Sequence, residues 1–187
     1  SKRKGDVSVE SYLAKGYVPE ALINFLALLG WNPTSDREIF TREELVKLFD
    51  LAKVNKAGAV MNTEKLNWTN AQYLKAMTDE KYLATCLHWL GREVEDKTFA
   101  GRVCLMVRER LQVLSELPAL TGYLFDDRLS FDAELMRWKT QPVAETKERL
   151  EGVREWLAQK DESFFQDGKM IEENLRAFIV TKGWGNG

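Results

Sequence analysis

The stretch Pro19–Gly30, PEALINFLALLG, decides the fold class. Its proline stands at the first-turn position of a helix, where the missing amide hydrogen costs nothing, and Gly30 stands where helices commonly end. Residues Glu20 to Leu29 are apolar on most sides of a helical wheel. The stretch therefore predicts a helix that is buried over most of its surface.

Helix signals of the same kind recur on both sides of this stretch. Thr41 and Glu44 have the spacing of a capping box, and so do Thr69 and Gln72. Thr78 predicts a third cap, for a helix that ends at Gly91. Further predicted helices are Thr98–Leu117, which Pro118 stops, a helix that Pro142 opens and that carries apolar residues from Val143 to Leu157, and Gly168–Lys182.

Strand signals are few. Only Glu38–Phe40 and Ala57–Met61 suggest short extended pieces around turns, and no internal repeat of fixed period occurs. The sequence therefore predicts an all-α protein, in which a multi-helix region precedes a helical bundle.

Composition and charge exclude several classes of protein. The chain has 187 residues, with 27 Lys and Arg against 29 Asp and Glu, so its formal net charge of −2 excludes binding of nucleic acid by global positive charge but permits a local basic face. Hydrophobic residues make up 44% and charged residues 30%, which is typical of a globular domain that fills a core. No apolar run approaches the roughly 18 residues of a membrane span. With two cysteines and no signal peptide, we expect a cytoplasmic protein with reduced thiols.

A single histidine, His88, restricts the possible chemistry further. Catalysis by two imidazoles, histidine-rich zinc sites and HExxH motifs all need more than one. Cys86, His88 and Cys104 are the only soft metal ligands, and we interpret them as core and surface residues rather than a metal site. No Gly-rich phosphate loop, Ser/His/Asp set or acidic metal cluster occurs, so the residues alone indicate a binding module rather than a self-contained enzyme.

The best hinge is Gly91 with the polar stretch 92–97, which predicts one domain over residues 1–90 and a second over residues 91–187. Both ends of the chain look cut. The chain begins without Met, and it ends in a turn whose Trp184 has nothing after it to pack on. We therefore expect a fragment whose second domain is incomplete.

Two arginines of the predicted helix Thr98–Leu117 differ in their surroundings. At about 100° per residue, Arg110 falls in the middle of an apolar stripe and Arg108 points the opposite way. A guanidinium on an apolar face needs a carboxylate, a carbonyl, or an external anion or base edge. The alternative is a structural arginine that favours the helix C-terminal dipole, and charge and spacing alone favour that alternative. The stripe comprises Phe99, Val103, Met106, Val107 and Leu114.

A second candidate site is the stretch Lys65–Asn70, KLNWTN, at the start of a predicted helix. An aromatic ring with lysine and amide side chains at a turn suits contact with a sugar–phosphate backbone. The alternative for Trp68 is a ring that pins two short helices together, which is the commoner role of an isolated Trp.

The first forty residues carry a family resemblance. The run SKR-x-GD-x-S, from Ser1, and the run GY-x-PEAL-x-N-x-LA-x-LGW, over Gly16–Trp31, closely resemble bacterial-type glutamyl-tRNA synthetase, where the first run is the tail of the ATP-site KMSKS loop and the second follows it. The likeness covers the whole chain and is strongest up to Met77. Further matches are Arg37–Phe40, Lys65–Asn70, Tyr73-Leu74, Leu117-Pro118 and Leu124-Phe125.

The resemblance implies a class I aminoacyl-tRNA synthetase, which attaches glutamate to tRNA(Glu) with ATP and Mg²⁺. It implies that residues 1–90 hold the end of the KMSKS loop and a stem-contact helical region, and that residues 91–187 hold an anticodon-binding helical domain truncated at its C-terminus. The catalytic domain would precede Ser1, so ATP and L-glutamate bind through the missing part, and we expect the fragment to be inactive alone and to hold no cofactor. We further expect a monomer that binds tRNA(Glu) and no membrane.

The resemblance also implies roles for single residues. Lys2 resembles the loop lysine that stabilises the ATP phosphates. Arg110 resembles the arginine that contacts the third anticodon base in discriminating enzymes, so the resemblance favours function for the arginine that the helical wheel singles out. Lys65 and Trp68 resemble contacts to the inner elbow of the tRNA, and Arg37 matches the pattern as a further tRNA-binding candidate.

Two rival hypotheses belong to other classes. One is a free-standing helical module for protein interaction, which the near-neutral charge suggests and which steep salt dependence of tRNA binding would exclude. The other is a paralogue that keeps the fold and serves in tRNA modification. Relatives of that kind generally lack this helical C-terminal region, which counts against the second hypothesis.

Overall fold

The computed structural model describes residues 8–33, 36–55, 58, 60–126, 130, 132–137 and 140–185. Contacts divide the chain into two compact units, Ser1–Asp127 and Arg128–Gly187. Over the described residues the regular structure is helical and no strand forms, which confirms the predicted all-α class. Glu38–Phe40 belongs to no helix or strand, and an isolated antiparallel bridge joins Trp31 and Val54.

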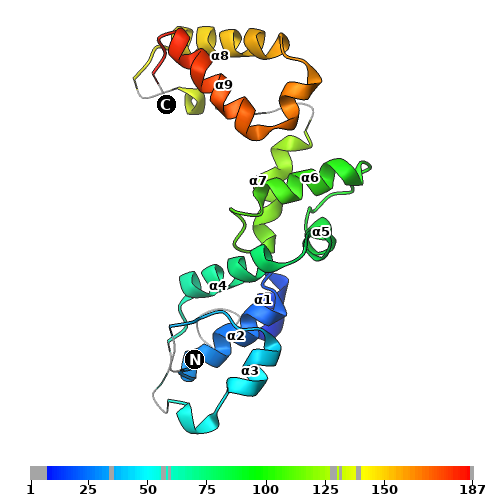
Figure 1. The fold of residues 1–187 in the computed structure, drawn as a ribbon, viewed down its shortest axis with the longest axis vertical. Helices are drawn as coiled ribbons and strands as arrows, with labels where there is room; N and C mark the ends of the chain where they lie inside the picture. Colours follow the sequence, from blue (N-terminus) through cyan, green and yellow to red (C-terminus); the bar gives the residue numbers. More distant parts are fainter. Residues whose placement is uncertain are drawn as a thin grey trace. The chain divides into compact units, whose positions relative to one another are not determined.

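The first unit consists of short helices (Figure 1). Within it α2 packs against α3 and α4, and α6 packs against α5 and α7. The α-helices are α1 (Val9–Ala14), α2 (Pro19–Gly30), α3 (Arg42–Leu48), α4 (Thr63–Ala76), α5 (Asp79–Leu87), α6 (Lys97–Val107) and α7 (Leu117–Thr121), and the 3-10 turns are η1 (Leu51–Lys53), η2 (Leu114–Glu116) and η3 (Gly122–Leu124).

Two of the predicted caps are confirmed. The Thr41 side chain accepts from the Glu44 amide, and the Glu44 carboxylate accepts from the Thr41 amide at 2.7 Å, so the capping box begins α3. The Thr78 side chain accepts from the Lys81 amide and begins α5. Both caps use only residues that are close in sequence, which is why the spacing alone predicts them.

The predicted capping box at Thr69 is wrong. The helix begins earlier, at Thr63, because the side chain of Asn62 caps it by accepting from the Lys65 amide at 3.0 Å. Thr69 therefore lies inside α4, and its hydroxyl donates to the Lys65 carbonyl at 2.9 Å. The predicted end of α5 at Gly91 is also wrong, since that helix ends at Leu87.

The predicted long helix Thr98–Leu117 is wrong as well. The helix α6 ends at Val107, and Pro118 lies in the first turn of α7 instead of stopping a helix. A straight helix would place Leu111 and Val113 on opposite sides, because they are about 200° apart on a helical wheel. The break lets the chain bury both of them, together with Leu114 and Leu117.

Contacts within and beyond the segment hold this break in place. The Glu116 carboxylate accepts from the amides of Gln112 and Val113 at 3.0 and 3.2 Å. The Leu114 amide donates to the Gly16 carbonyl at 3.2 Å. Gly16 has φ +88°, and a Cβ there would lie 2.7 Å from the Leu114 Cβ, so only glycine allows this approach.

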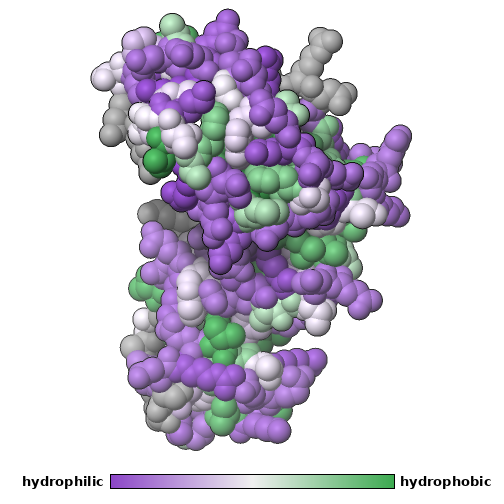
Figure 2. Space-filling view, turned by 45° about the horizontal axis from the view of Figure 1, so that its top comes forward, coloured by the Kyte–Doolittle hydropathy of each residue, from purple (hydrophilic) through white to green (hydrophobic). Residues whose placement is uncertain are grey.

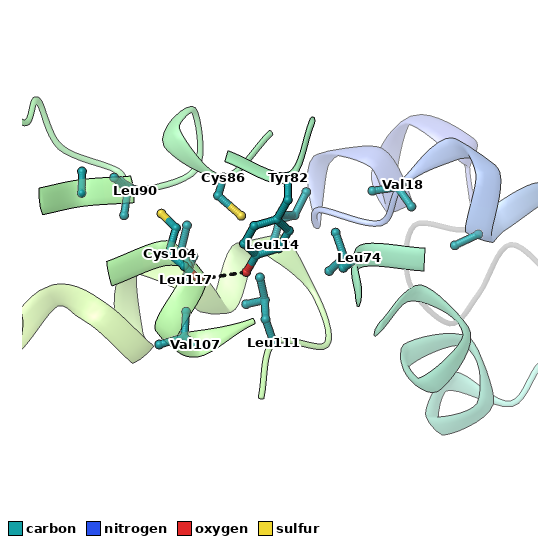
Figure 3. Packing of buried hydrophobic residues seen from close by; sticks show 12 residues of the cluster. Val18, Leu74, Tyr82, Cys86, Leu90, Cys104, Val107, Leu111, Leu114 and Leu117 are labelled. Atoms are coloured by element: carbon teal, nitrogen blue, oxygen red, sulfur yellow. Dashed lines mark hydrogen bonds between the residues drawn. The ribbon is translucent and has the colours of Figure 1, made fainter. Parts of the chain in front are cut away.

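The main core of the first unit joins α2, α4, α5, α6 and α7 (Figure 3). At its centre the hydroxyl of Tyr82, which is fully buried, donates to the Cys104 carbonyl at 3.1 Å. The core includes Leu90 before Gly91 and Ala100 after it, so packing is continuous across Gly91. The boundary between the two compact units lies instead between Asp127 and Arg128. The functional boundary at Gly91 stays a prediction.

The second unit pairs α8 (Val143–Ala158) with α9 (Gly168–Thr181), beside the turns η4 (Ala133–Met136) and η5 (Glu162–Gln166). Trp156 of α8 stacks on Phe178 of α9 at 5.0 Å between ring centroids. Trp184 packs edge-on against Phe178 at 5.8 Å, and Gly152 lies close beneath its ring. The C-terminal Trp thus packs on preceding residues, which the sequence did not indicate.

Among the described residues, no helix is both long and apolar enough to cross a bilayer. On the face that Figure 2 shows, hydrophilic residues predominate and apolar residues form small separate groups.

Candidate functional site

Segment 38–40 lies next to the first group of candidate residues, and side chains of α2 and α4 hold it in place. Asn24, fully buried in α2, donates to the Glu38 carbonyl at 2.7 Å and accepts from the Phe40 amide at 3.0 Å. The hydroxyl of Tyr73 on α4 donates to the Phe40 carbonyl at 2.5 Å. Burial raises the pKa of Tyr73 to about 12, so this hydroxyl keeps its proton at neutral pH. The segment is therefore fixed to both α2 and α4.

Lys65 lies in the first turn of α4 and contacts two other residues. Its ammonium group forms an ion pair with the Glu38 carboxylate and lies 5.4 Å from the centre of the Trp68 ring. Trp68 follows one helical turn after Lys65 and is 41% exposed. The three side chains therefore present a cation, a carboxylate and an aromatic ring together at the surface.

Arg37 directly precedes segment 38–40 in the sequence. Its Nε donates to the Ile39 carbonyl at 2.7 Å, and its Nη2 donates to the Glu44 carboxylate at 2.5 Å. Its guanidinium lies 4.7 Å from the centre of the Phe40 ring. The hydrogen bond from Arg37 is the main reason that the pKa of Glu44 lies below its usual value. Both Arg37 and Lys65 are thus paired with carboxylates in the free chain.

A cavity of about 700 Å³ is lined by these cations and by apolar residues. Arg37, Glu38 and Lys65 line it together with Phe25 and Trp31. The indole nitrogen of Trp31 is buried and has no hydrogen-bond partner among the described residues. The structure thus places Arg37 and Lys65 at one cavity, and Trp68 lies beside Lys65.

The structure places Arg110 outside any helix, and it does not line the cavity of Arg37 and Lys65. It lies in the turn 108–113 between α6 and η2, which we call the α6–η2 turn. Its side chain is exposed and forms no hydrogen bond or ion pair with any described residue. The predicted stripe around it is wrong, because α6 ends at Val107 and Met106 is 58% exposed. The role of Arg110 in base recognition stays a prediction.

Arg108 is a structural residue that the sequence analysis missed. Its guanidinium donates to three carbonyls at the end of α4, those of Leu74 (3.3 Å), Lys75 (3.0 Å) and Met77. It also donates to the Asp79 carboxylate at 2.7 Å and lies 4.6 Å from the centre of the Tyr82 ring. Only 14% of its side chain is exposed. A cation at the end of α6 was a visible signal, but its partners lie about thirty positions earlier and no local pattern points to them.

The three soft ligands are core and surface residues, as we predict. Cys86 and Cys104 are fully buried and His88 is exposed. Hydrogen bonding to Cys104, followed by burial, raises the pKa of the Cys86 thiol, which disfavours the thiolate that a metal needs. No group of three or more His, Cys, Asp or Glu in the described part of the chain could hold a metal ion. Lys2 lies outside the described residues.

Two family models match the chain. The model of the catalytic domain of class I tRNA synthetases (E and Q) matches residues 1–68. The model of the anticodon binding domain matches residues 59–187, which is more than half of the chain. The second match contains Lys65, Trp68 and Arg110.

The chain is similar in sequence and in structure to glutamate–tRNA ligases. A glutamate–tRNA ligase of Prosthecochloris aestuarii is 36% identical over 199 aligned residues, covering 98% of this chain and 38% of the relative. A crystal structure of a glutamate tRNA ligase from Elizabethkingia meningosepticum, in complex with its amino acid, matches 93% of this chain at a TM-score of 0.71 and 33% identity. The glutamate–tRNA synthetase of Elizabethkingia anophelis matches with a TM-score of 0.69 and 32% identity. This chain spans about a third of the length of those two structures.

Proposed function

The chain belongs to the anticodon binding domain family, and we propose that it forms the tRNA-binding part of a glutamate–tRNA ligase. The observation that carries this proposal is the family match over residues 59–187, which includes three of the five candidate residues. The 36% identity to a glutamate–tRNA ligase supports glutamate as the amino acid and tRNA(Glu) as the partner.

We assign Lys65, Trp68 and Arg37 to the tRNA backbone at the inner elbow. In the free chain Lys65 is paired with Glu38, with both side chains more than 40% exposed. An exposed pair of this kind contributes about 1 kcal/mol or less, so a phosphate can replace the carboxylate at little cost. The Trp68 ring beside the ammonium group offers a flat face to a ribose or a base. Contacts of this kind position an RNA without reading its sequence.

We assign Arg110 to the third base of the anticodon. Its guanidinium is exposed and unpaired among the described residues, so binding to a base breaks no bond within the chain. A planar fork can donate two hydrogen bonds to the acceptor edge of a cytosine, and such a contact discriminates between bases by roughly 1–3 kcal/mol.

We assign ATP, Mg²⁺ and L-glutamate to the catalytic part of the intact ligase. Within this chain only Lys2 is proposed to contact ATP, through the phosphates, as a positive charge. The chain spans 38% of the length of its curated relative, and we expect the remaining groups of that site in the part that it does not cover.

Salt titration of tRNA binding tests the proposal. The chain has a net charge of −2, so global attraction to RNA is absent and a salt dependence reports local contacts. We expect a tRNA(Glu) transcript to bind with an affinity that falls steeply between about 50 and 200 mM salt. The control is an RNA hairpin of equal length, which we expect to bind more weakly. Equal affinity for both RNAs, or no binding of tRNA(Glu), would contradict the proposal.

A further inference from the structure

The contacts of Arg108 tie the end of one helix to the end of another. Its Nη2 donates to the Lys75 carbonyl at 3.0 Å and to the Met77 carbonyl, and its Nε donates to the Leu74 carbonyl at 3.3 Å. Carbonyls at the end of a helix have no partner inside that helix. Arg108, the C-cap residue of α6, therefore satisfies the end of α4.

The planar guanidinium fixes the direction of these hydrogen bonds. Its Nη1 donates to the Asp79 carboxylate at 2.7 Å while the plane lies 4.6 Å from the centre of the Tyr82 ring. Tyr82 is fully buried, and Arg108 itself is 14% exposed. Lysine has the same charge but no planar fork, so it cannot reach three carbonyls and a carboxylate at once.

Two further contacts fix the α6–η2 turn that follows. Glu109 forms an ion pair with Lys75 of α4 at 2.8 Å. The buried Asn70 of α4 donates to the Gln112 carbonyl at 2.6 Å. Arg110 lies between these two residues in the sequence, and its side chain forms no hydrogen bond or ion pair with any described residue.

We infer that Arg108 is a positioning residue for base recognition: it fixes the α6–η2 turn on α4 so that the guanidinium of Arg110 meets the third anticodon base in one orientation. The inference rests on the proposed function of Arg110. The guanidinium of Arg108 is bound within the chain, whereas that of Arg110 is available to bind RNA.

The test is a double-mutant cycle on the chain as it exists. The measured quantity is the ratio of dissociation constants for two tRNA(Glu) transcripts that differ only in C or G at the third anticodon position. We expect Arg108→Lys to lower this preference about fivefold, because a displaced fork loses one hydrogen bond to the base. In the Arg110→Gln background we expect Arg108→Lys to have no further effect on the ratio.

Arg102→Lys is the matched control, since it makes the same substitution at an exposed position of α6, outside the turn, and leaves every contact of Arg108 in place. We expect it to keep the wild-type ratio. If Arg108→Lys is not folded at the assay temperature, Asp79→Ala removes one contact of the guanidinium and should lower the ratio by a smaller factor.

Either of two results would overturn the inference. One is a wild-type ratio in every folded variant that has lost a contact of Arg108. The other is an equal effect of Arg108→Lys with and without Arg110. Failure of the proposed function looks different, because then the wild-type chain shows no preference between the two transcripts or does not bind them.

Discussion

The ammonium group of Lys65 lies 5.4 Å from the centre of the Trp68 ring, one turn further along α4. Both residues are partly exposed, so this cation–π pair contributes only about 0.5–1 kcal/mol to stability. The cation–π contact therefore adds little to the stability of the fold, and thermal melting of each variant separates a loss of binding from a loss of folding.

Lys65→Ala and Trp68→Ala should weaken tRNA binding by similar factors for any anticodon. Loss of the lysine should also lower the slope of log K against log salt by roughly one, because one phosphate contact disappears. Loss of the ring should leave that slope unchanged, since stacking involves no counterion. Binding measured over a salt series distinguishes the two variants.

Lys169→Ala, an exposed lysine at the start of α9, is the control for a change of charge alone. We expect it to bind tRNA more tightly than Lys65→Ala. An effect of Lys65→Ala that is confined to one anticodon sequence would contradict the assignment of Lys65 to the backbone.

Glu38→Gln should strengthen tRNA binding about two- to fivefold at low salt. The substitution removes the carboxylate that pairs with Lys65, and an exposed pair of this kind is worth about 1 kcal/mol or less. The Glu38 carbonyl, which Asn24 holds, is unchanged. Weaker binding by this variant would instead show that Glu38 orients Lys65 for the RNA.

Arg108→Ala should lower the free energy of unfolding by roughly 2–4 kcal/mol, because three carbonyls lose their charged partner in a nearly closed site. Chemical denaturation measures this loss. Arg102→Ala, on an exposed position of the same helix, should change stability by less than about 0.5 kcal/mol. Equal stability of the two variants would contradict the structural role of Arg108.

Local signals in the sequence predict much of the fold. The helix Pro19–Gly30, the capping box of Thr41 and Glu44, and the cap at Thr78 need only neighbouring residues, and the structure confirms all three. The helices of the second unit also follow their apolar spacing, with α8 and α9 close to the predicted ranges.

The break after α6 depends on residues that are distant in sequence. The Leu114 amide reaches Gly16, almost a hundred positions earlier, and Arg108 reaches the end of α4. Helical periodicity cannot detect such partners, so the wheel placed Arg110 on a helix face that does not exist. For the same reason the structural role of Arg108 could not be predicted from the sequence.

Tyr73 should make stability fall at alkaline pH. Burial raises its pKa from 10.0 to about 12 in the folded chain, so the folded state holds the proton more tightly than the unfolded state. Its contribution is complete below pH 10.0 and is lost as the pH rises through about 12. Tyr73→Phe should cost about 1 kcal/mol at neutral pH, through its lost hydrogen bond to the Phe40 carbonyl, and should show a shallower alkaline decline.

Denaturation curves at several alkaline pH values measure this effect. Tyr123→Phe, at a tyrosine that is 53% exposed, is the control for loss of a hydroxyl group. An alkaline decline in Tyr73→Phe as steep as that of the wild type would contradict the role of Tyr73.

The most direct test of the central claim is the binding preference of the chain between two tRNA(Glu) transcripts with C or G as the third anticodon base, measured for the wild type and for Arg110→Gln. We predict that the wild type prefers C by roughly 1–3 kcal/mol, or about fivefold to 150-fold, and that Arg110→Gln loses this preference at unchanged thermal stability. A variant that keeps the preference, or that loses stability by several kcal/mol without a change in preference, would contradict the account.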